Sequence, residues 1–583
     1  MDELFLEPLK YYEQVGREAH EKNTIEYFDN LLKESGVNLE ENRSTVKAYN
    51  TENTFIEQIA GKISKYKLLR GLLIAAIVIG AIMLLIGFGQ FPEAILTGII
   101  LILLGAGFIA GSIVLMVKKI NPLIKDSNAV KAEHEQKAQE LLQKAHEQMA
   151  PLNALFDNVD TFRIIEKTIP EFTFDNKYTK EQEAFLTNHY DFLDLSSDET
   201  TMQNTLAGRF KGNPFLYCQR LVHEMRTATY TGSLTITWTE TYRDSSGHLQ
   251  TRRRSETLYA SVTKPKPEFY SNTYLAYGNQ AAPELNFTRA PQHSETLNEK
   301  ELRKKVKSGE KDLKKMARKA TKEGDSFQEM ANSEFEVLFG AQDRDNEVQF
   351  RLMFTPLAQR NTVALVTNKI GYGDDFYFNK HRRFNVITSE HAQNWNMLTS
   401  PNVYYSYDVD TAKLNFINFN TNYFKSIFFD FAPLFSVPTY LEEPCASLAP
   451  VEDYDCNYTC YEHEVMANAI GQERFAHRDS HTESILKTAM VGKQGNADIV
   501  NVTAYSYTTV ERTDYVPVKG GDGHYHNVPV EWIEYIPISN STNMKIEAAD
   551  LTENEYSAAV AEEDCKVPVG TFFHGLVANI IEE

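Results

Sequence analysis

The chain has 583 residues, with 80 acidic against 59 basic side chains and a formal net charge of -21. Its length is too great for one compact core, and 42% hydrophobic with 24% charged residues is typical of a folded chain. The acidic balance argues against a general nucleic-acid binder, since phosphates need a basic surface. Five cysteines fit a reducing compartment better than a secreted disulfide framework.

The N-terminal 70 residues are expected to be helical. An amphipathic helix is predicted over residues 11–32, and Ile56, Ile59, Ile63 and Tyr66 recur at three- and four-residue steps. Beyond residue 118, a similar repeat runs through Ala138, Leu141, Ala145, Leu152 and Leu155. These repeats predict two antiparallel helices of a coiled-coil stalk.

Between the two repeats lie two uncharged apolar runs, residues 71–89 and 94–117, separated by a turn containing Pro92. Each is long enough to cross a bilayer as a helix. The two runs predict a transmembrane hairpin. Steps of small residues, Gly107 with Gly111 and Ala76 with Gly80, predict close helix approach, either within the hairpin or between copies.

The charges that flank the spans predict their orientation. The connecting turn has no Lys or Arg, so the positive-inside rule places both termini in the cytoplasm, on a cell membrane. The flanking basic residues are Lys62, Lys65, Lys67, Arg70, Lys118, Lys119 and Lys125.

The remaining chain is predicted to be α+β with mostly antiparallel sheet. Alternating strands at 233–242 and 255–263 surround the turn 244–247, and strands at 501–518 and 528–538 surround the glycine-rich turn 519–523. Between these hairpins we expect loops at 264–267, a helical stretch over 297–332, an aromatic-rich β region over 335–437 and a helical piece over 462–490. The predicted domains are residues 1–70, 71–117, 118–160, 161–296, 297–332 and 333–583.

One segment of the helical stretch, residues 300–322, is strongly basic. Its apolar side is formed by Leu302, Val306, Leu313, Met316 and Ala320. Such a helix can lie against anionic lipid or an acidic protein, whereas the simpler interpretation is a solvated face on an ordinary helix. Gly309 argues against one continuous helix. The candidate contact residues are Lys304, Lys305, Lys311, Lys314, Lys315, Arg318 and Lys319.

A second candidate is a structural zinc site at Cys456, Cys460 and His463, with Cys445 upstream. The C-x3-C spacing is looser than that of a zinc knuckle, which favours buried free cysteines instead. His463-Glu464 begins like H-E-x-x-H, but Ala467 replaces the second histidine. Two further histidine pairs are weaker metal candidates: His477 with His481, expected on one helix face, and His524 with His526 in a strand.

Residues 333–387, which include SEFEVLFGAQDRDNEVQFRLMFTPLAQR, resemble a family of uncharacterised bacterial membrane proteins. In that family a phenylalanine-rich strand, an acidic turn and a Leu/Phe-Thr-Pro step (here Phe354-Thr355-Pro356) follow a long helix. The resemblance implies an N-terminal two-helix transmembrane hairpin with a large cytosolic α+β region. It implies no catalytic residue, because the family has no assigned activity.

The leading functional prediction is a membrane-anchored cytosolic scaffold or binding module without catalytic activity. Aromatic side chains over 404–435 are candidates for partner contact, although core packing is the simpler interpretation. One alternative is a metal-dependent enzyme that uses the cysteines and histidines above. Another is an accessory subunit of a transporter or secretion assembly, which requires oligomerisation or a membrane-protein partner, because two spans alone form no pore.

Overall fold

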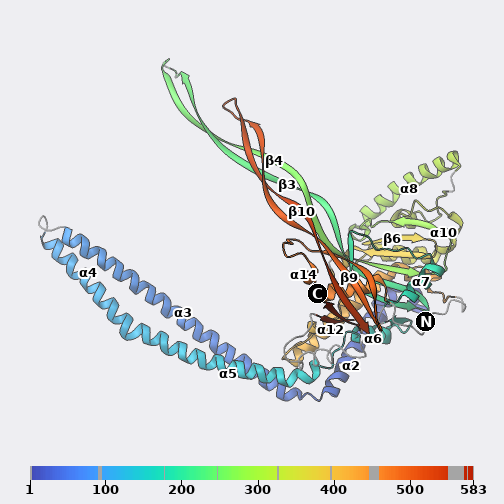
Figure 1. Cartoon of the computed structure of the whole chain (residues 1–583), viewed down its shortest axis with the longest axis horizontal. Coiled ribbons are helices and arrows are strands. Elements are labelled where there is room, and N and C mark those ends of the chain that lie inside the picture. Colours follow the sequence, from blue (N-terminus) through green and yellow to red (C-terminus); the bar gives the residue numbers. More distant parts are fainter. Residues whose placement is uncertain are drawn as a thin grey trace. The chain divides into compact units, whose positions relative to one another are not determined.

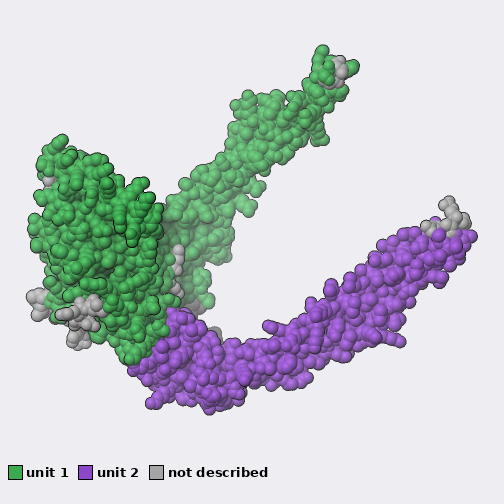
Figure 2. All heavy atoms as spheres, turned by 180° about the vertical axis from the view of Figure 1, so that it is seen from behind, with its two compact units in different colours: residues 1–23, 157–400, 420–583 green, residues 24–156, 401–419 purple. Residues whose placement is uncertain are grey.

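The computed structural model describes residues 3–89, 95–175, 178–243, 245, 247–324, 327–393, 395, 397–444, 458–548, 570–573 and 576–581. The protein is 51% helical and 30% strand, with two long apolar helices and antiparallel sheets, which confirms the predicted α+β class. It divides into two compact units. Unit 1 comprises residues 1–23, 157–400 and 420–583, and unit 2 comprises residues 24–156 and 401–419 (Figure 2).

Unit 2 is built on long helices. Helix α3 (Leu39–Gly89) packs against α4 (Ile95–Leu115) and α5 (Asn121–Asn153), which follow one another through a π-helical turn, Met116–Ile120 (Figure 1). Glu52 contacts His134 of α5 at 2.5 Å, and Gln148 donates to Glu41 at 3.0 Å. Residue numbers therefore rise along α3 while those of the contacted residues fall along α5, so the two helices run antiparallel.

The apolar parts of these helices are unlike those of a soluble core. Both helices are long and apolar enough to cross a membrane, and only 11% of each apolar window is buried. A core helix of a soluble protein would be mostly buried.

Glycines bring α3 and α4 together. A Cβ added to Gly80 would lie 2.9 Å from the carbonyl oxygen of Gly105, and one added to Gly105 would lie 2.7 Å from the carbonyl oxygen of Gly80. Within the described residues, a Cβ at Gly107 or Gly111 would meet no heavy atom within 4 Å. The close approach within the hairpin therefore uses Gly105 rather than the predicted step at Gly107 and Gly111.

We expect Gly105→Ile to destabilise the helical hairpin by about 2 kcal/mol, because its side chain overpacks the contact with Gly80. Gly107→Ile is the matched control on the open side of the same helix, and it should leave stability nearly unchanged. The measurement is the free energy of unfolding of the full chain in mixed detergent micelles. Equal effects of the two substitutions would contradict the observed helix contact.

The first sheet of unit 1 is antiparallel, with strand order β1-β2-β3-β4-β7-β6-β5. Its strands are β1 (Phe172–Asp175), β2 (Thr200–Phe210), β3 (Asn213–Arg243), β4 (Leu249–Gly278), β5 (Asn286–Arg289), β6 (Phe376–His381) and β7 (Phe384–Ser389). The second sheet has the order β11-β12-β10-β9-β8. Its strands are β8 (Ile485–Gln494), β9 (Ala497–Lys519), β10 (Tyr525–Ala548), β11 (Gly570–Phe573) and β12 (Leu576–Ile581).

Helix α13 (Cys460–Ile470) is buried on both sides between the sheets. Tyr461 and Val465 belong to a core cluster with β2, β3, β4 and helix α7 (Lys180–Tyr190). Met466 and Ala467 belong to a second cluster with β8, β9, β10 and β12. The helix therefore joins the two sheets through its opposite faces.

The two hairpins, β3–β4 and β9–β10, are confirmed, and both are longer than predicted. They extend outward together (Figure 1), and β10 contacts both β3 and β4. Ile236 and Leu258 from one hairpin pack against Val528 from the other. A Cβ added to Gly232 would lie 2.0 Å from the carbonyl oxygen of Pro529, so glycine permits this close contact. We call this pair of packed ribbons the β-arm.

Three predicted segments differ in the structure, namely residues 264–267, 462–490 and 335–437. Residues 264–267 are not a loop but part of β4, where Pro265 and Pro267 are tolerated because this stretch pairs only with β3 and leaves one edge open. The helical piece over 462–490 ends after α14 (Gln472–Phe475), and β8 follows.

The region 335–437 is mostly helical rather than β. It contains α9 (Ser333–Phe339), α10 (Glu347–Met353), α11 (Pro356–Thr367) and α12 (Val409–Phe435), and only β6 and β7 are strands. The expected phenylalanine-rich strand of the family resemblance is α9. Apolar runs of this length do not distinguish strand from buried helix by themselves.

The aromatic side chains over 404–435 lie mainly in the core. Tyr404 and Phe416 are 0% exposed, and the second half of α12 places Phe428, Phe431 and Phe435 in unit 1 at 1% exposure. The ring of Phe431 lies 5.0 Å from that of Phe172, in an edge-to-face arrangement. These rings therefore hold the fold together, and only a few, such as Tyr405 at 38% exposure, reach the surface.

Candidate functional site

The basic segment forms one helix, α8 (Glu299–Glu323). Asn298 caps its first turn by accepting hydrogen bonds from the backbone N–H groups of Lys300 and Glu301. The helix ends at Gly324, whose φ is +76°. Gly309 does not interrupt it: a Cβ there would lie 2.6 Å from both methyl carbons of Val337, so glycine lets α9 approach.

The apolar stripe of α8 is occupied within the protein. Leu313 and Ala320 are buried in a cluster with Phe327 and Val337, and Met316 packs at its edge. This stripe is therefore not available to insert into a lipid interface, as a free amphipathic helix would do.

The opposite side of α8 is a continuous basic surface. The helix contains eleven basic and five acidic residues, and successive side chains turn by about 100° around its axis. Eight exposed basic residues lie at roughly 100–200° around the axis from Leu313 and form what we call the basic face: Lys300, Lys304, Lys307, Lys311, Lys314, Lys315, Arg318 and Lys322. With 25 residues, the face extends over roughly 37 Å.

Two of the seven predicted contact residues lie apart from this face. Lys305 is half-buried, and its Nζ donates to the backbone oxygen of Gln292 and to Ser294 Oγ, both at 3.1 Å. Burial lowers the pKa of Lys305. Lys319 is exposed beside the face and pairs with Glu323 at 3.8 Å. The other five predicted residues belong to the basic face.

The predicted zinc ligands are only partly within the described residues. Cys456 and Cys445 lie outside them. Cys460 is a free, exposed thiol at the start of α13, and His463 is buried with Nε2 3.2 Å from Asp498 Oδ2. The described residues contain no group of three Cys, His, Asp or Glu side chains arranged to hold a metal ion.

The other metal candidates are the two pairs of histidines. His477 and His481 do not share a helix face, because both lie in the turn between α14 and β8. His481 Nδ1 contacts Thr509 Oγ1 at 2.7 Å. His524 lies in the hairpin turn, and His526 in β10 contacts Asp522 at 2.9 Å. His481 and His526 thus each contact a polar side chain of the protein itself.

A buried ionisable cluster was not predicted from the sequence. His391 Nδ1 lies 2.6 Å from Asp375 Oδ2, and its Nε2 lies 3.7 Å from Asp430 Oδ1. Tyr217 donates its hydroxyl to Asp430 at 2.5 Å. The ring of Tyr372 stacks on that of His391 at 3.7 Å, with an interplanar angle of 3°. The sequence shows Asp375 only as part of a Gly-Tyr-Gly-Asp-Asp run, and nothing in it indicates the partners.

Burial and charge oppose each other in this cluster. Burial disfavours the charged form of His391, but the Asp430 charge and the hydrogen bond to Asp375 outweigh it and raise the pKa of His391. Burial raises the pKa of Asp430, although His391 and the Tyr217 hydroxyl act in the other direction. Both groups bind protons more tightly in the folded protein than in the unfolded chain.

Because both pKa values are raised on folding, the cluster favours the folded state at low pH and loses this contribution as pH rises. We expect the free energy of unfolding to fall more between about pH 6 and pH 8 in the wild type than in His391→Gln. At about pH 6, His391→Gln should cost about 2 kcal/mol, the usual value of a charge-assisted hydrogen bond.

Denaturant unfolding of the detergent-solubilised chain at each pH measures this effect. His381→Gln, at an exposed position of β6, is the matched control and should follow the wild type. A His391→Gln profile parallel to that of the wild type would show that the buried imidazole does not titrate with folding.

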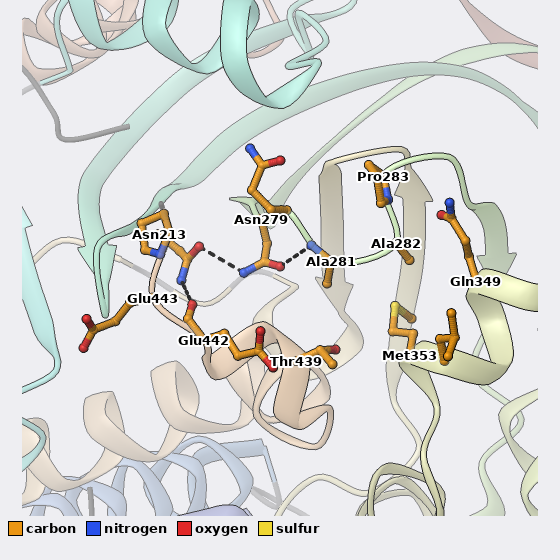
Figure 3. Close-up of a pocket in the computed structure, with 13 residues that line it drawn as sticks. Asn213, Asn279, Ala281, Ala282, Pro283, Gln349, Met353, Thr439, Glu442 and Glu443 are labelled. Atoms are coloured by element: carbon orange, nitrogen blue, oxygen red, sulfur yellow. Dashed lines mark hydrogen bonds between the residues drawn. The ribbon is translucent and has the colours of Figure 1, made fainter. Parts of the chain in front are cut away.

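A cavity of about 620 Å³ lies at the base of the first sheet (Figure 3). Asn279 Nδ2 donates to Asn213 Oδ1 at 3.0 Å, and Asn213 Nδ2 donates to the backbone oxygen of Glu442 at 2.8 Å. The lining residues are Asn213, Asn279, Gln280, Ala281, Ala282, Pro283, Gln349, Leu352, Met353, Thr439, Glu442, Glu443 and Pro444.

The lining of this cavity is polar and carries acidic side chains. Its two asparagine amides are held by each other and by the backbone, and its charged side chains are those of Glu442 and Glu443. No Lys, Arg, His, Cys or Ser is among these described lining residues, so phosphates and carboxylates have no charged partner there.

Comparisons with protein-family models, with curated proteins and with solved structures find no match to this chain. The resemblance of residues 333–387 to a bacterial membrane-protein family therefore stays a prediction.

Proposed function

We propose that the chain is a membrane-anchored scaffold that acts by binding, and that the basic face of α8 docks on anionic lipid at the cytosolic surface of the cell membrane. The observation that carries this proposal is that the two sides of α8 have different surroundings. Its apolar stripe packs inside the protein, whereas its opposite side exposes eight basic residues. In a chain of net charge -21, such a surface favours an anionic partner.

The choice of lipid rests on proximity and charge. The two apolar helices of unit 2 are long enough to anchor the chain, which keeps a lipid surface at high effective concentration. Each Lys or Arg near an anionic leaflet contributes about 1 kcal/mol. Since the apolar stripe is occupied, the contact is electrostatic and should weaken as salt screens it. The metal-enzyme and accessory-subunit alternatives gain no support from the described residues.

Lysine footprinting tests this contact. With the full chain in lipid nanodiscs, the α8 lysines should react more slowly with an amine-acylating reagent in anionic than in neutral bilayers. Lys369 and Lys519, exposed elsewhere, should react equally in both. Protection should disappear in the charge-reversed variant Lys311→Glu/Lys314→Glu/Arg318→Glu and at high salt.

The matched control is Lys369→Glu/Arg478→Glu/Lys519→Glu, which makes the same change in net charge at exposed positions outside α8. It should retain the protection of α8. Equal reactivity of α8 in anionic and neutral bilayers would reject the lipid contact, and α8-dependent capture of an acidic protein would then assign the face to a protein partner.

We also propose that the chain before the first span and the chain after the second span both lie in the cytoplasm. Basic residues flank the spans and are missing from the turn between them. A cysteine at the exposed tip of the β3–β4 hairpin, Ser245→Cys, reports on this orientation. A membrane-impermeant maleimide should label that peptide in inside-out vesicles and not in intact cells. Labelling in intact cells would reverse the proposed topology; the wild-type chain controls for the native thiols.

A further inference from the structure

We propose that a second cavity, at the root of the β-arm, binds an organic cation that carries N–H donors, such as an alkylammonium or guanidinium group. The cavity measures about 530 Å³, within the range of small-molecule sites. It lies where both hairpins leave their sheets. Its lining residues are Asp198, Glu199, His223, Phe269, Ile485, Tyr505, Ser506, Tyr507, Pro537, Ile538 and Ser539.

The polar groups of this cavity form a relay that ends in acceptors. His223 Nδ1 contacts the Glu199 carboxylate, and His223 Nε2 lies 3.2 Å from the hydroxyl of Tyr507. A neutral imidazole that donates from Nδ1 to Glu199 accepts a hydrogen bond from the Tyr507 hydroxyl at Nε2. The lone pairs of Tyr507 Oη are then left to accept a hydrogen bond from a ligand.

The charges that line the cavity favour a positively charged ligand. Asp198 and Glu199 are exposed carboxylates at the cavity, and no Lys or Arg belongs to its described lining. Burial and the nearby Glu199 carboxylate raise the pKa of Tyr507, so the phenol stays protonated and neutral. The two carboxylates would repel an anionic ligand and attract a cation.

Aromatic rings complete the site. The ring of His223 lies 5.4 Å from that of Tyr507 and 5.1 Å from that of Phe269, and Tyr505 lines the same cavity at 51% exposure. Aromatic faces next to carboxylates are the surroundings that favour organic cations. The source of the cation is either a free small amine or the side chain of an Arg or Lys in a peptide.

Calorimetric titration of the detergent-purified full chain tests the site. The probes are agmatine, an arginine tripeptide with blocked termini, the neutral analogue butylurea and the anion butyrate. Agmatine or the tripeptide should bind saturably, while butylurea and butyrate should not. Tighter binding of agmatine points to a free amine, and tighter binding of the tripeptide points to a peptide side chain.

Substitutions locate the binding. Glu199→Gln should weaken binding by about tenfold or more, the effect of losing one charge-assisted hydrogen bond. Glu511→Gln, at an exposed carboxylate farther along β9, should keep the wild-type affinity. If Glu199→Gln fails to fold by circular dichroism, Tyr507→Phe replaces it and should also weaken binding.

Absence of saturable binding by both cations in the millimolar range would overturn the proposal, as would equal affinities of Glu199→Gln and Glu511→Gln. Neither result bears on the basic face of α8, which is formed by different residues and binds charge of the opposite sign.

Discussion

The burial of α13 between two antiparallel sheets is the constraint on which unit 1 depends. A helix with cores on both sides has no solvent-facing stripe, so its charged residues require partners inside the protein. Glu462 accepts hydrogen bonds from the backbone N–H of Tyr178 and from Thr205 Oγ1, both at 2.8 Å. Glu464 accepts from the backbone N–H of Met202 at 2.9 Å and pairs with Lys487 at 2.6 Å. These contacts reach both sheets, so the helix fixes one against the other.

That arrangement sets the course of the hairpins. Since β3–β4 and β9–β10 start from two sheets joined by one helix, they extend together from the core of unit 1 and pack as ribbons in the β-arm. The contacts at Gly232 and Val528 hold them in register with each other. The cavity at their root is a consequence, because it is lined by strands of both sheets.

Charge is used in two different ways in this protein. Inside unit 1, Arg289 pairs with Asp374 and Arg344 with Glu336, all fully or nearly fully buried, and such pairs mainly avoid the cost of an unpaired charge. On the basic face of α8 the side chains stay in water, and the ion pairs with Glu299 and Asp312 are exposed and weak. Only the second kind leaves charge available to a partner, which is why α8 rather than the buried His391 cluster carries the proposed function.

The sequence by itself determined the features that are encoded within a few neighbouring residues. Uncharged runs indicated the two apolar helices, glycine-rich turns with alternating strands indicated both hairpins, and the spacing of Leu313 and Ala320 opposite the lysines indicated α8. The same local signal was present but misinterpreted in α12, where Phe424, Phe428, Phe431 and Phe435 recur at helical spacing within a region expected to be β.

Only the tertiary structure decided which distant residues meet. His391, Asp375 and Asp430 come from separate segments, as do Glu199, His223 and Tyr507, and no spacing in the sequence connects them. It also decided that the apolar stripe of α8 is occupied and that the close helix approach uses Gly105 rather than Gly107. The physical reason is that periodicity and turn chemistry act between neighbours in the chain, whereas sites are formed by packing between strands and helices far apart in sequence.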